Sequence, residues 1–270
     1  MTSASAFSGR RGGTGVGQPV DIMHKASDAR RELIYELASS GCGVALALFM
    51  AGHMLLVGSI LAGARGFDQV AIGLENFNVA QPTVVVVLIL FTVHAVLALR
   101  KVPAGLRQRR RLRQLAQDLR PATLAPSAGG RDDPRTHVHL DSLLWIWQVR
   151  TGFVILVLGS FHVLLLGVDV LTPLFGERTG IEAASSAARV AGGLWPIYAV
   201  LLLCVEFHAG AGLYRLAVKW GTASRVPRSR LRRIEFVIIV VFLGIGSLAL
   251  AVLAGWLEPP LEFLVAGSHG

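Results

Sequence analysis

Apolar residues gather in five long blocks along the 270-residue chain, and polar segments separate the blocks. The blocks cover residues 39–62, 82–99, 143–168, 194–218 and 234–257. A helix of about 20 apolar residues crosses the hydrocarbon core of a bilayer. The pattern therefore predicts an all-α membrane protein, a five-transmembrane-helix bundle. It also divides the chain into an N-terminal tail (1–38), a membrane domain (39–257) and a C-terminal tail (258–270).

The basic residues predict how the bundle is oriented. Five Lys or Arg precede the first block, ten lie in residues 100–135, and seven lie in residues 215–233. The other connections hold only Arg65, Arg178 and Arg189, and the C-terminal tail holds none. Cytoplasmic loops carry the excess of Lys and Arg. We therefore expect a multi-pass protein of the inner (cytoplasmic) membrane, with a cytoplasmic N-terminus and the C-terminus outside.

Composition agrees with a membrane protein and argues against a nucleic-acid partner. Charged residues make up 16% of the chain, against about 25% in soluble proteins. The net charge of +9 comes from residues placed between apolar blocks rather than along a solvated face. Residues 107–120 predict a short basic helix at the membrane surface, which contacts either anionic lipid or a partner protein. The Gly- and Ser-rich residues 1–20 lack the apolar core of a signal peptide and are expected to be disordered.

Four of the eight histidines fall inside the apolar blocks. His53, His94, His162 and His208 occupy the first four blocks, one in each, and the fifth block has none. A single histidine in a membrane helix often hydrogen-bonds a neighbouring helix. Four histidines, one per helix, suit two haems in which each iron takes two axial imidazoles.

The depth of each histidine in the bilayer predicts which ones pair. The second and fourth blocks run in the same direction, with His94 about six residues before Arg100 and His208 about seven before Arg215, so both lie near the cytoplasmic side. His53 lies past the middle of the first block, and His162 lies about six residues from the outer end of the third. We therefore expect His94 with His208 on an inner haem, and His53 with His162 on an outer haem.

Other residues of the same blocks fit this interpretation. Gly52, Gly159, Gly210 and Gly212 lie close to the histidines, and small residues there either admit a flat porphyrin or pack two helices together. Arg215 and Lys219 could pair with haem propionates, although both also serve topology.

Glu206 lies in the fourth block, two residues before His208. An ionisable residue at that depth is costly and points to a function. Two residues of helix turn its side chain roughly 200° from His208, toward a different neighbour. Glu206 is either a proton carrier beside the haem or a protonated carboxyl that bonds a neighbouring helix.

Four motifs resemble the dihaem cytochrome b membrane anchor of quinol:fumarate reductases and succinate:quinone oxidoreductases. They are GHMLLVGSIL at Gly52, HAVLALRKVP at His94, LWIWQVRTGFVILVLGSFHV at Leu144 and WPIYAVLLLCVEFHAGAGLYRLAVKWG at Trp195. The resemblance covers four of the five blocks. It implies a five-helix anchor with two b haems, one above the other, that docks an iron–sulfur subunit and a flavoprotein subunit on the cytoplasmic side.

The resemblance also implies roles for individual residues. His53 and His162 match the ligands of the distal haem iron, and His94 and His208 match those of the proximal one. Glu206 matches a carboxylate that passes protons across the membrane. Lys219 matches a basic residue near a propionate of the proximal haem, and Glu75 is the nearest match to a carboxylate of the menaquinone site.

The function implied is electron transfer between menaquinone or menaquinol and the iron–sulfur subunit, while the succinate or fumarate site lies on a partner subunit. Two alternatives remain: a haem b membrane subunit of a hydrogenase or formate dehydrogenase, and a haem-free proton-coupled transporter. A pairing of two complexes into a dimer of heterotrimers stays open.

Overall fold

The computed structural model describes residues 19–123, 140–172, 182–221 and 225–266. These residues form helices, with no strand among them: α1 (Pro19–Gly58), η1 (Ser59–Ala62), α2 (Gly63–Asn76), α3 (Ala80–Thr123), α4 (Leu140–Leu171), α5 (Ala183–Arg189), η2 (Val190–Leu194), α6 (Trp195–Lys219), α7 (Arg228–Leu253) and α8 (Phe263–Ala266). Five helical stretches are long and apolar enough to cross a membrane. The predicted all-α fold with five spans is confirmed.

The chain divides into two compact units, residues 1–38 and residues 39–270. The described part of the first unit, residues 19–38, is helical. The predicted disorder of residues 1–20 falls almost wholly on residues outside the described part. The second unit holds all five predicted spans.

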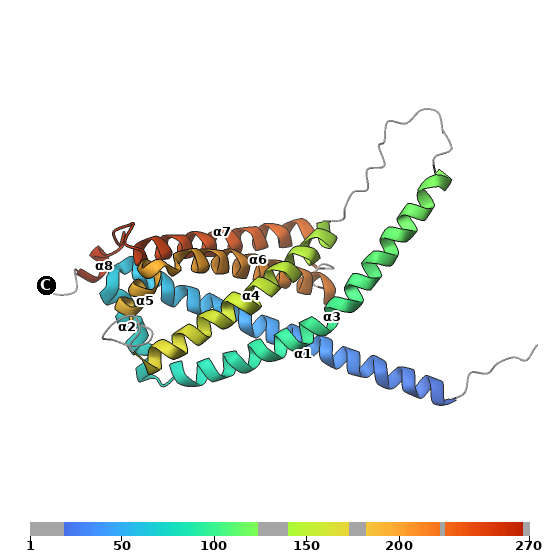
Figure 1. Ribbon diagram of the computed structural model, residues 1–270, viewed down its shortest axis with the longest axis horizontal. Helices are drawn as coiled ribbons and strands as arrows, with labels where there is room; N and C mark the ends of the chain where they lie inside the picture. Colours follow the sequence, from blue (N-terminus) through green and yellow to red (C-terminus); the bar gives the residue numbers. More distant parts are fainter. Residues whose placement is uncertain (1–18, 124–139, 173–181, 222–224, 267–270) are drawn as a thin grey trace, which may run out of the picture. The chain divides into compact units, whose positions relative to one another are not determined.

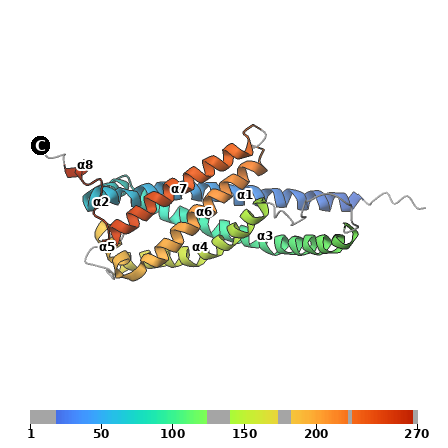
Figure 2. The ribbon, with the colours of Figure 1, turned by 90° about the horizontal axis from the view of Figure 1, so that it is seen from above.

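The long helices of the second unit run alongside one another (Figure 1, Figure 2). α6 packs between α4 and α7. α1 also contacts α7, because a Cβ on Gly58 would lie 2.8 Å from a methyl carbon of Ile245. α3 approaches α4 closely, since a Cβ on Gly105 would lie 2.6 Å from the Trp145 ring. The four helices that carry histidines are therefore neighbours, and α7 covers α6 and α1.

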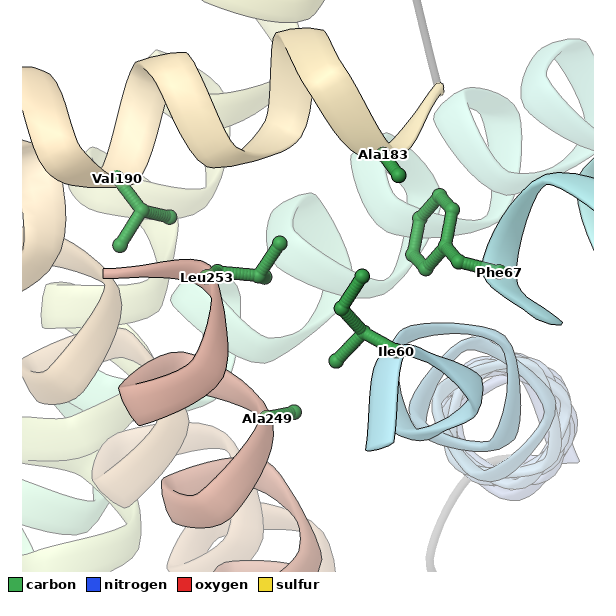
Figure 3. Close-up of a cluster of buried hydrophobic side chains, with 6 residues drawn as sticks. All are labelled: Ile60, Phe67, Ala183, Val190, Ala249 and Leu253. Atoms are coloured by element: carbon green, nitrogen blue, oxygen red, sulfur yellow. The ribbon is translucent and has the colours of Figure 1, made fainter. Parts of the chain in front are cut away.

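Short helices close one end of this bundle (Figure 1). Ile60, Phe67, Ala183, Val190, Ala249 and Leu253 form a buried apolar cluster there, drawn from η1, α2, α5, η2 and α7 (Figure 3). The segments expected as outer loops thus fold into α2 and α5. The Asp68 carboxylate accepts a hydrogen bond of 2.8 Å from the Ala183 N–H, which ties α2 to the start of α5.

Two glycines make the sharp turns at this end possible. Gly63 separates η1 from α2 with φ = 87°, and Gly193 precedes α6 with φ = 103°. Only glycine adopts this left-handed region without strain. α6 then begins with Pro196 in its first turn, where the missing N–H costs no helical hydrogen bond.

The basic segment after the second span differs from its prediction. Residues 107–120 do not form a separate surface helix but continue α3, which runs unbroken to Thr123. Pro103 lies inside α3 and did not end it. Proline removes one helical hydrogen bond, and helices of membrane proteins tolerate it where neighbouring groups satisfy the freed carbonyl.

Candidate functional site

The four histidines of the predicted spans, all partly buried, meet as two pairs. The ring centroids of His53 and His162 lie 6.4 Å apart, and those of His94 and His208 also lie 6.4 Å apart. These are the pairs that depth predicts. That each pair ligates a haem iron remains a prediction.

The spacing of each pair fits one metal ion between two imidazoles. With metal–nitrogen bonds of about 2 Å and a ring radius of about 1.1 Å, two axial imidazoles have centroids about 6 Å apart. No cluster of three or more His, Cys, Asp or Glu suited to a metal occurs in the described ranges. An iron that already has four porphyrin nitrogens needs only two protein ligands. The residues therefore fit haem better than a metal bound by protein alone.

Hydrogen bonds orient both rings of the His94–His208 pair. His94 Nδ1 lies 3.1 Å from the carbonyl oxygen of Ser39, and His208 Nδ1 lies 2.9 Å from that of Gln148. A carbonyl can only accept, so each Nδ1 carries the proton and each Nε2 keeps its lone pair. Metal-bound histidines usually hold their second nitrogen in this way.

Two glycines that the sequence analysis did not select lie against these rings. A Cβ on Gly43 would come within 3.1 Å of His94 Cε1, and one on Gly152 within 3.0 Å of His208 Cε1. Of the glycines that were selected, Gly210 packs against Ile239 of α7 and Gly212 faces Gln148. Gly210 therefore serves helix packing, which was the alternative considered for it.

The His53–His162 pair has aromatic and polar neighbours. The Phe49 ring stacks on His53 with centroids 5.8 Å apart, and Tyr198 meets His162 edge-on at 5.4 Å. His162 Nδ1 is buried and has no hydrogen-bond partner within the described residues. A buried imidazole nitrogen without a hydrogen-bond partner, in an apolar bundle, is also consistent with a cofactor bound beside this ring.

A buried ion pair lies near this pair of histidines. Arg189 of α5 donates to the Asp169 carboxylate at the end of α4, and both side chains are almost completely buried. Arg189 also donates a hydrogen bond to Ser186 Oγ and forms a side-chain hydrogen bond with Tyr198. Sequence analysis had placed Asp169 and Arg189 in a loop. This ion pair depends on a contact between residues 20 positions apart, which no local sequence pattern predicts.

The variant Arg189→Met is expected to destabilise the protein, because it leaves the Asp169 charge buried and unpaired. Breaking a buried pair from one side costs about 3–5 kcal/mol. Thermal unfolding of the purified protein in detergent measures this loss. The double variant Arg189→Met/Asp169→Leu removes both charges and is expected to recover most of the lost stability. A single variant as stable as the parent contradicts the role of the pair.

Glu206 lies on a different face of α6 from His208. Its side chain is 7% exposed. Leu202 and Gly210, four residues to either side, both face α7: Leu202 touches Gly246, and Gly210 touches Ile239. Residues four apart share a helix face. Glu206 thus faces α7, whereas His208 faces α4, and no hydrogen bond to the Glu206 carboxyl involves a described residue.

The two basic residues of α6 lie beyond His208. Arg215 is about 10 Å further along the axis and donates to the side-chain oxygen of Gln148. Lys219 is about 16 Å along, is exposed, and places its ammonium 5.9 Å from the centre of the Trp220 ring. Both lie at the same end as the His94–His208 pair.

Glu75 lies in the last turn of α2 and is exposed. In the described part of the chain, no hydrogen bond or ion pair joins it to the His53–His162 pair. Tyr198 contacts His162 of that pair, and Arg189, which pairs with Asp169, hydrogen-bonds Tyr198. The quinone-site role of Glu75 remains a prediction.

Comparisons with known proteins agree with the geometry of the bundle. Residues 130–247 match the family described as Succinate dehydrogenase/Fumarate reductase transmembrane subunit. A fumarate reductase cytochrome b subunit of Helicobacter pylori is 33% identical over 78% of this chain and 76% of its own length. The subunit of the same name from Wolinella succinogenes is 35% identical over 67% of this chain and 64% of its own length. The chain belongs to the family of fumarate reductase and succinate dehydrogenase cytochrome b membrane subunits.

Proposed function

We propose that this chain carries electrons through the membrane on two b haems, between a quinone and an iron–sulfur subunit. The observation that carries the proposal is the pair of histidine pairs, each with 6.4 Å between ring centroids. His53 and His162 hold one haem iron, and His94 and His208 hold the other. Bound haem b supplies a one-electron carrier whose iron alternates between ferric and ferrous states.

The two pairs lie at different depths of the same bundle. On α1, Gly43 faces the His94–His208 pair and His53 belongs to the other pair. On α6, Tyr198 contacts His162 and His208 belongs to the second pair. Both intervals are ten residues, about 15 Å of helix. Agreement between two helices supports an electron route along the bundle axis.

The distribution of basic residues supports the orientation of this route. With the N-terminus in the cytoplasm and the C-terminus outside, the His94–His208 pair faces the cytoplasmic side. The iron–sulfur and flavoprotein subunits dock there, and the flavoprotein holds the succinate or fumarate site. Arg215 and Lys219 lie at this end and neutralise haem propionates. The quinone, which we propose to be menaquinone, binds near the His53–His162 pair, with Glu75 as the proposed carboxylate.

Glu206 takes up and releases protons in this proposal. Its carboxyl is buried between α6 and α7, on a different face from the iron ligand of the same helix. The free energy of an electron that crosses the membrane changes by about 2.3 kcal/mol for each 100 mV of membrane potential. A proton that moves through Glu206 in the same direction offsets that charge movement.

A dithionite-reduced minus oxidised spectrum tests the haem assignment. The purified protein is expected to show the α-band of a b-type cytochrome, with two haems per chain by pyridine haemochrome analysis. A spectrum without an α-band would favour a proton-coupled transporter and end the proposal.

Purification from native membranes tests the partners. We expect a flavoprotein with succinate dehydrogenase or fumarate reductase activity to co-purify with this chain. Co-purification with a hydrogenase or formate dehydrogenase instead would assign the haems to another respiratory complex.

A further inference from the structure

We propose that Gly43 and Gly152 are positioning residues for the imidazoles of His94 and His208. Because each glycine lacks a Cβ, the backbone carbonyl four residues before it can accept a hydrogen bond from the Nδ1–H of the imidazole on the facing helix. These two hydrogen bonds fix the orientation of the rings and therefore the angle between their planes. The inference rests on the proposed function, because the angle has a measurable effect only when an iron is bound between the rings.

Helix geometry explains why glycine is needed at these positions. A helical carbonyl points toward the N–H four residues later, and the Cα–Cβ bond of that later residue tilts back toward the N-terminus. A side chain at position i+4 therefore shields the carbonyl of residue i from a donor on another helix. Gly43 stands four residues after Ser39, and Gly152 stands four residues after Gln148. With no Cβ at either site, the imidazoles reach these carbonyls at 3.1 Å and 2.9 Å.

The contacts show that an added methyl group would disturb the rings. A Cβ at Gly43 would meet His94 Cε1 at 3.1 Å and Nδ1 at 3.4 Å, and a Cβ at Gly152 would meet His208 at 3.0 Å and 3.4 Å. Each ring would have to give way by a few tenths of an ångström. The same movement lengthens the hydrogen bond from Nδ1.

The arrangement occurs twice with one spacing. On α1, Ser39, Gly43 and His53 are four and ten residues apart, and on α4, Gln148, Gly152 and His162 have the same spacing. Each of these helices thus provides a member of one histidine pair and, about 15 Å away, the carbonyl and glycine that orient a member of the other. Two independent helices with the same register indicate that the glycines belong to the site.

The result is a pair of nearly perpendicular rings. The planes of His94 and His208 meet at 86°, whereas those of His53 and His162 meet at 58°. Parallel imidazoles separate two iron d orbitals in energy, while perpendicular imidazoles leave them nearly equal. The more nearly equal these orbitals are, the larger the highest g value of the ferric low-spin ion. A hydrogen bond from Nδ1–H also makes the imidazole a more basic ligand, which favours ferric iron.

Electron paramagnetic resonance and a redox titration test the proposal on the protein purified with its co-purifying subunits. Gly43→Ala and Gly152→Ala are each expected to keep the b-type α-band. Each should lower the highest g value of the low-spin signal of the His94–His208 pair and shift the midpoint potential of that haem upward. The signal of the His53–His162 pair is expected to stay in place.

Gly41→Ala on α1 and Gly167→Ala on α4 are the matched controls, because an added Cβ at either site meets nothing within 4 Å. Neither control is expected to move a g value. Equal shifts of both signals, no shift, or a shift of the same size in the controls would overturn the proposal.

The unsubstituted protein keeps the proposal testable where the variants do not assemble. It is expected to show two low-spin signals, the one with the higher g value assigned to the His94–His208 pair. Two signals with the same g values would overturn the inference. A protein without any b-type α-band would instead remove the proposed function, so the two failures are distinguishable.

Discussion

His208→Ala is expected to abolish one of the two b haems and leave the other in place. In the proposed function, His94 of α3 and His208 of α6 hold one haem iron, so the substitution would leave that iron with His94 as its single protein ligand. The His53–His162 pair lies about 15 Å away along the bundle, and its ligands come from α1 and α4. Pyridine haemochrome analysis should fall from two haems per chain to one, and turnover with quinol should be lost because the electron route is interrupted.

Two further variants check the His208→Ala result. His94→Ala is expected to remove the same haem, identified by the same g value and midpoint potential. Leu213→Ala shortens an exposed side chain of α6 and is expected to keep both haems. Loss of both haems in His208→Ala, with the protein still folded, would show that the pairing of histidines is wrong.

The spans and the histidine pairs could be predicted because both follow from one-dimensional patterns. A membrane helix needs an apolar run of known length, so the hydropathy of the chain located all five spans. Helical rise converts a position in a span into a depth, which was enough to place His53 beside His162 and His94 beside His208. Helical rotation likewise placed Glu206 on a different face from His208.

The parts that sequence reasoning missed depend on contacts between distant segments. Asp169 and Arg189 looked like loop residues, since nothing local shows that α5 folds back and brings Arg189 to the end of α4. The hydrophobic pattern of residues 63–76 is that of a surface helix rather than a span, and α2 was expected as a loop. The basic residues 107–120 were expected as a separate short helix, but they continue α3 through Pro103.

Gly43 and Gly152 had a signal that could have been found. The spacing of a glycine ten residues before a histidine occurs in the first span with His53 and in the third span with His162. Sequence reasoning looked instead for glycines adjacent to the ligands, and so selected Gly52 and Gly210. The glycine that matters for a ring lies on the facing helix, because the added Cβ would meet the imidazole across the gap between two helices.

The position of Glu206 decides what a substitution there should do. Within the described residues no hydrogen bond or ion pair joins Glu206 to either histidine pair, and the α6 face on which it lies is the one packed on α7. An isosteric change of its carboxyl should therefore leave the haem ligands undisturbed. Glu206 is only 7% exposed, so this face is closed to lipid. A carboxyl buried within the membrane is costly and therefore points to a function.

Glu206→Gln is expected to keep both haems and to slow quinone-coupled turnover by about a hundredfold or more, the usual effect of removing a proton-transfer group. Glutamine has the size and polarity of glutamate but cannot carry a proton, so the difference isolates proton transfer. The measurement is fumarate reduction by a menaquinol analogue in proteoliposomes, with and without a membrane potential.

Glu206→Asp keeps an ionisable carboxyl and should retain part of the rate, and Glu258→Gln, on an exposed residue after α7, should retain all of it. An artificial donor that reduces the partner subunits directly should support equal rates in every variant. Unchanged quinol turnover and an unchanged response to membrane potential in Glu206→Gln would leave Glu206 with a packing role between α6 and α7.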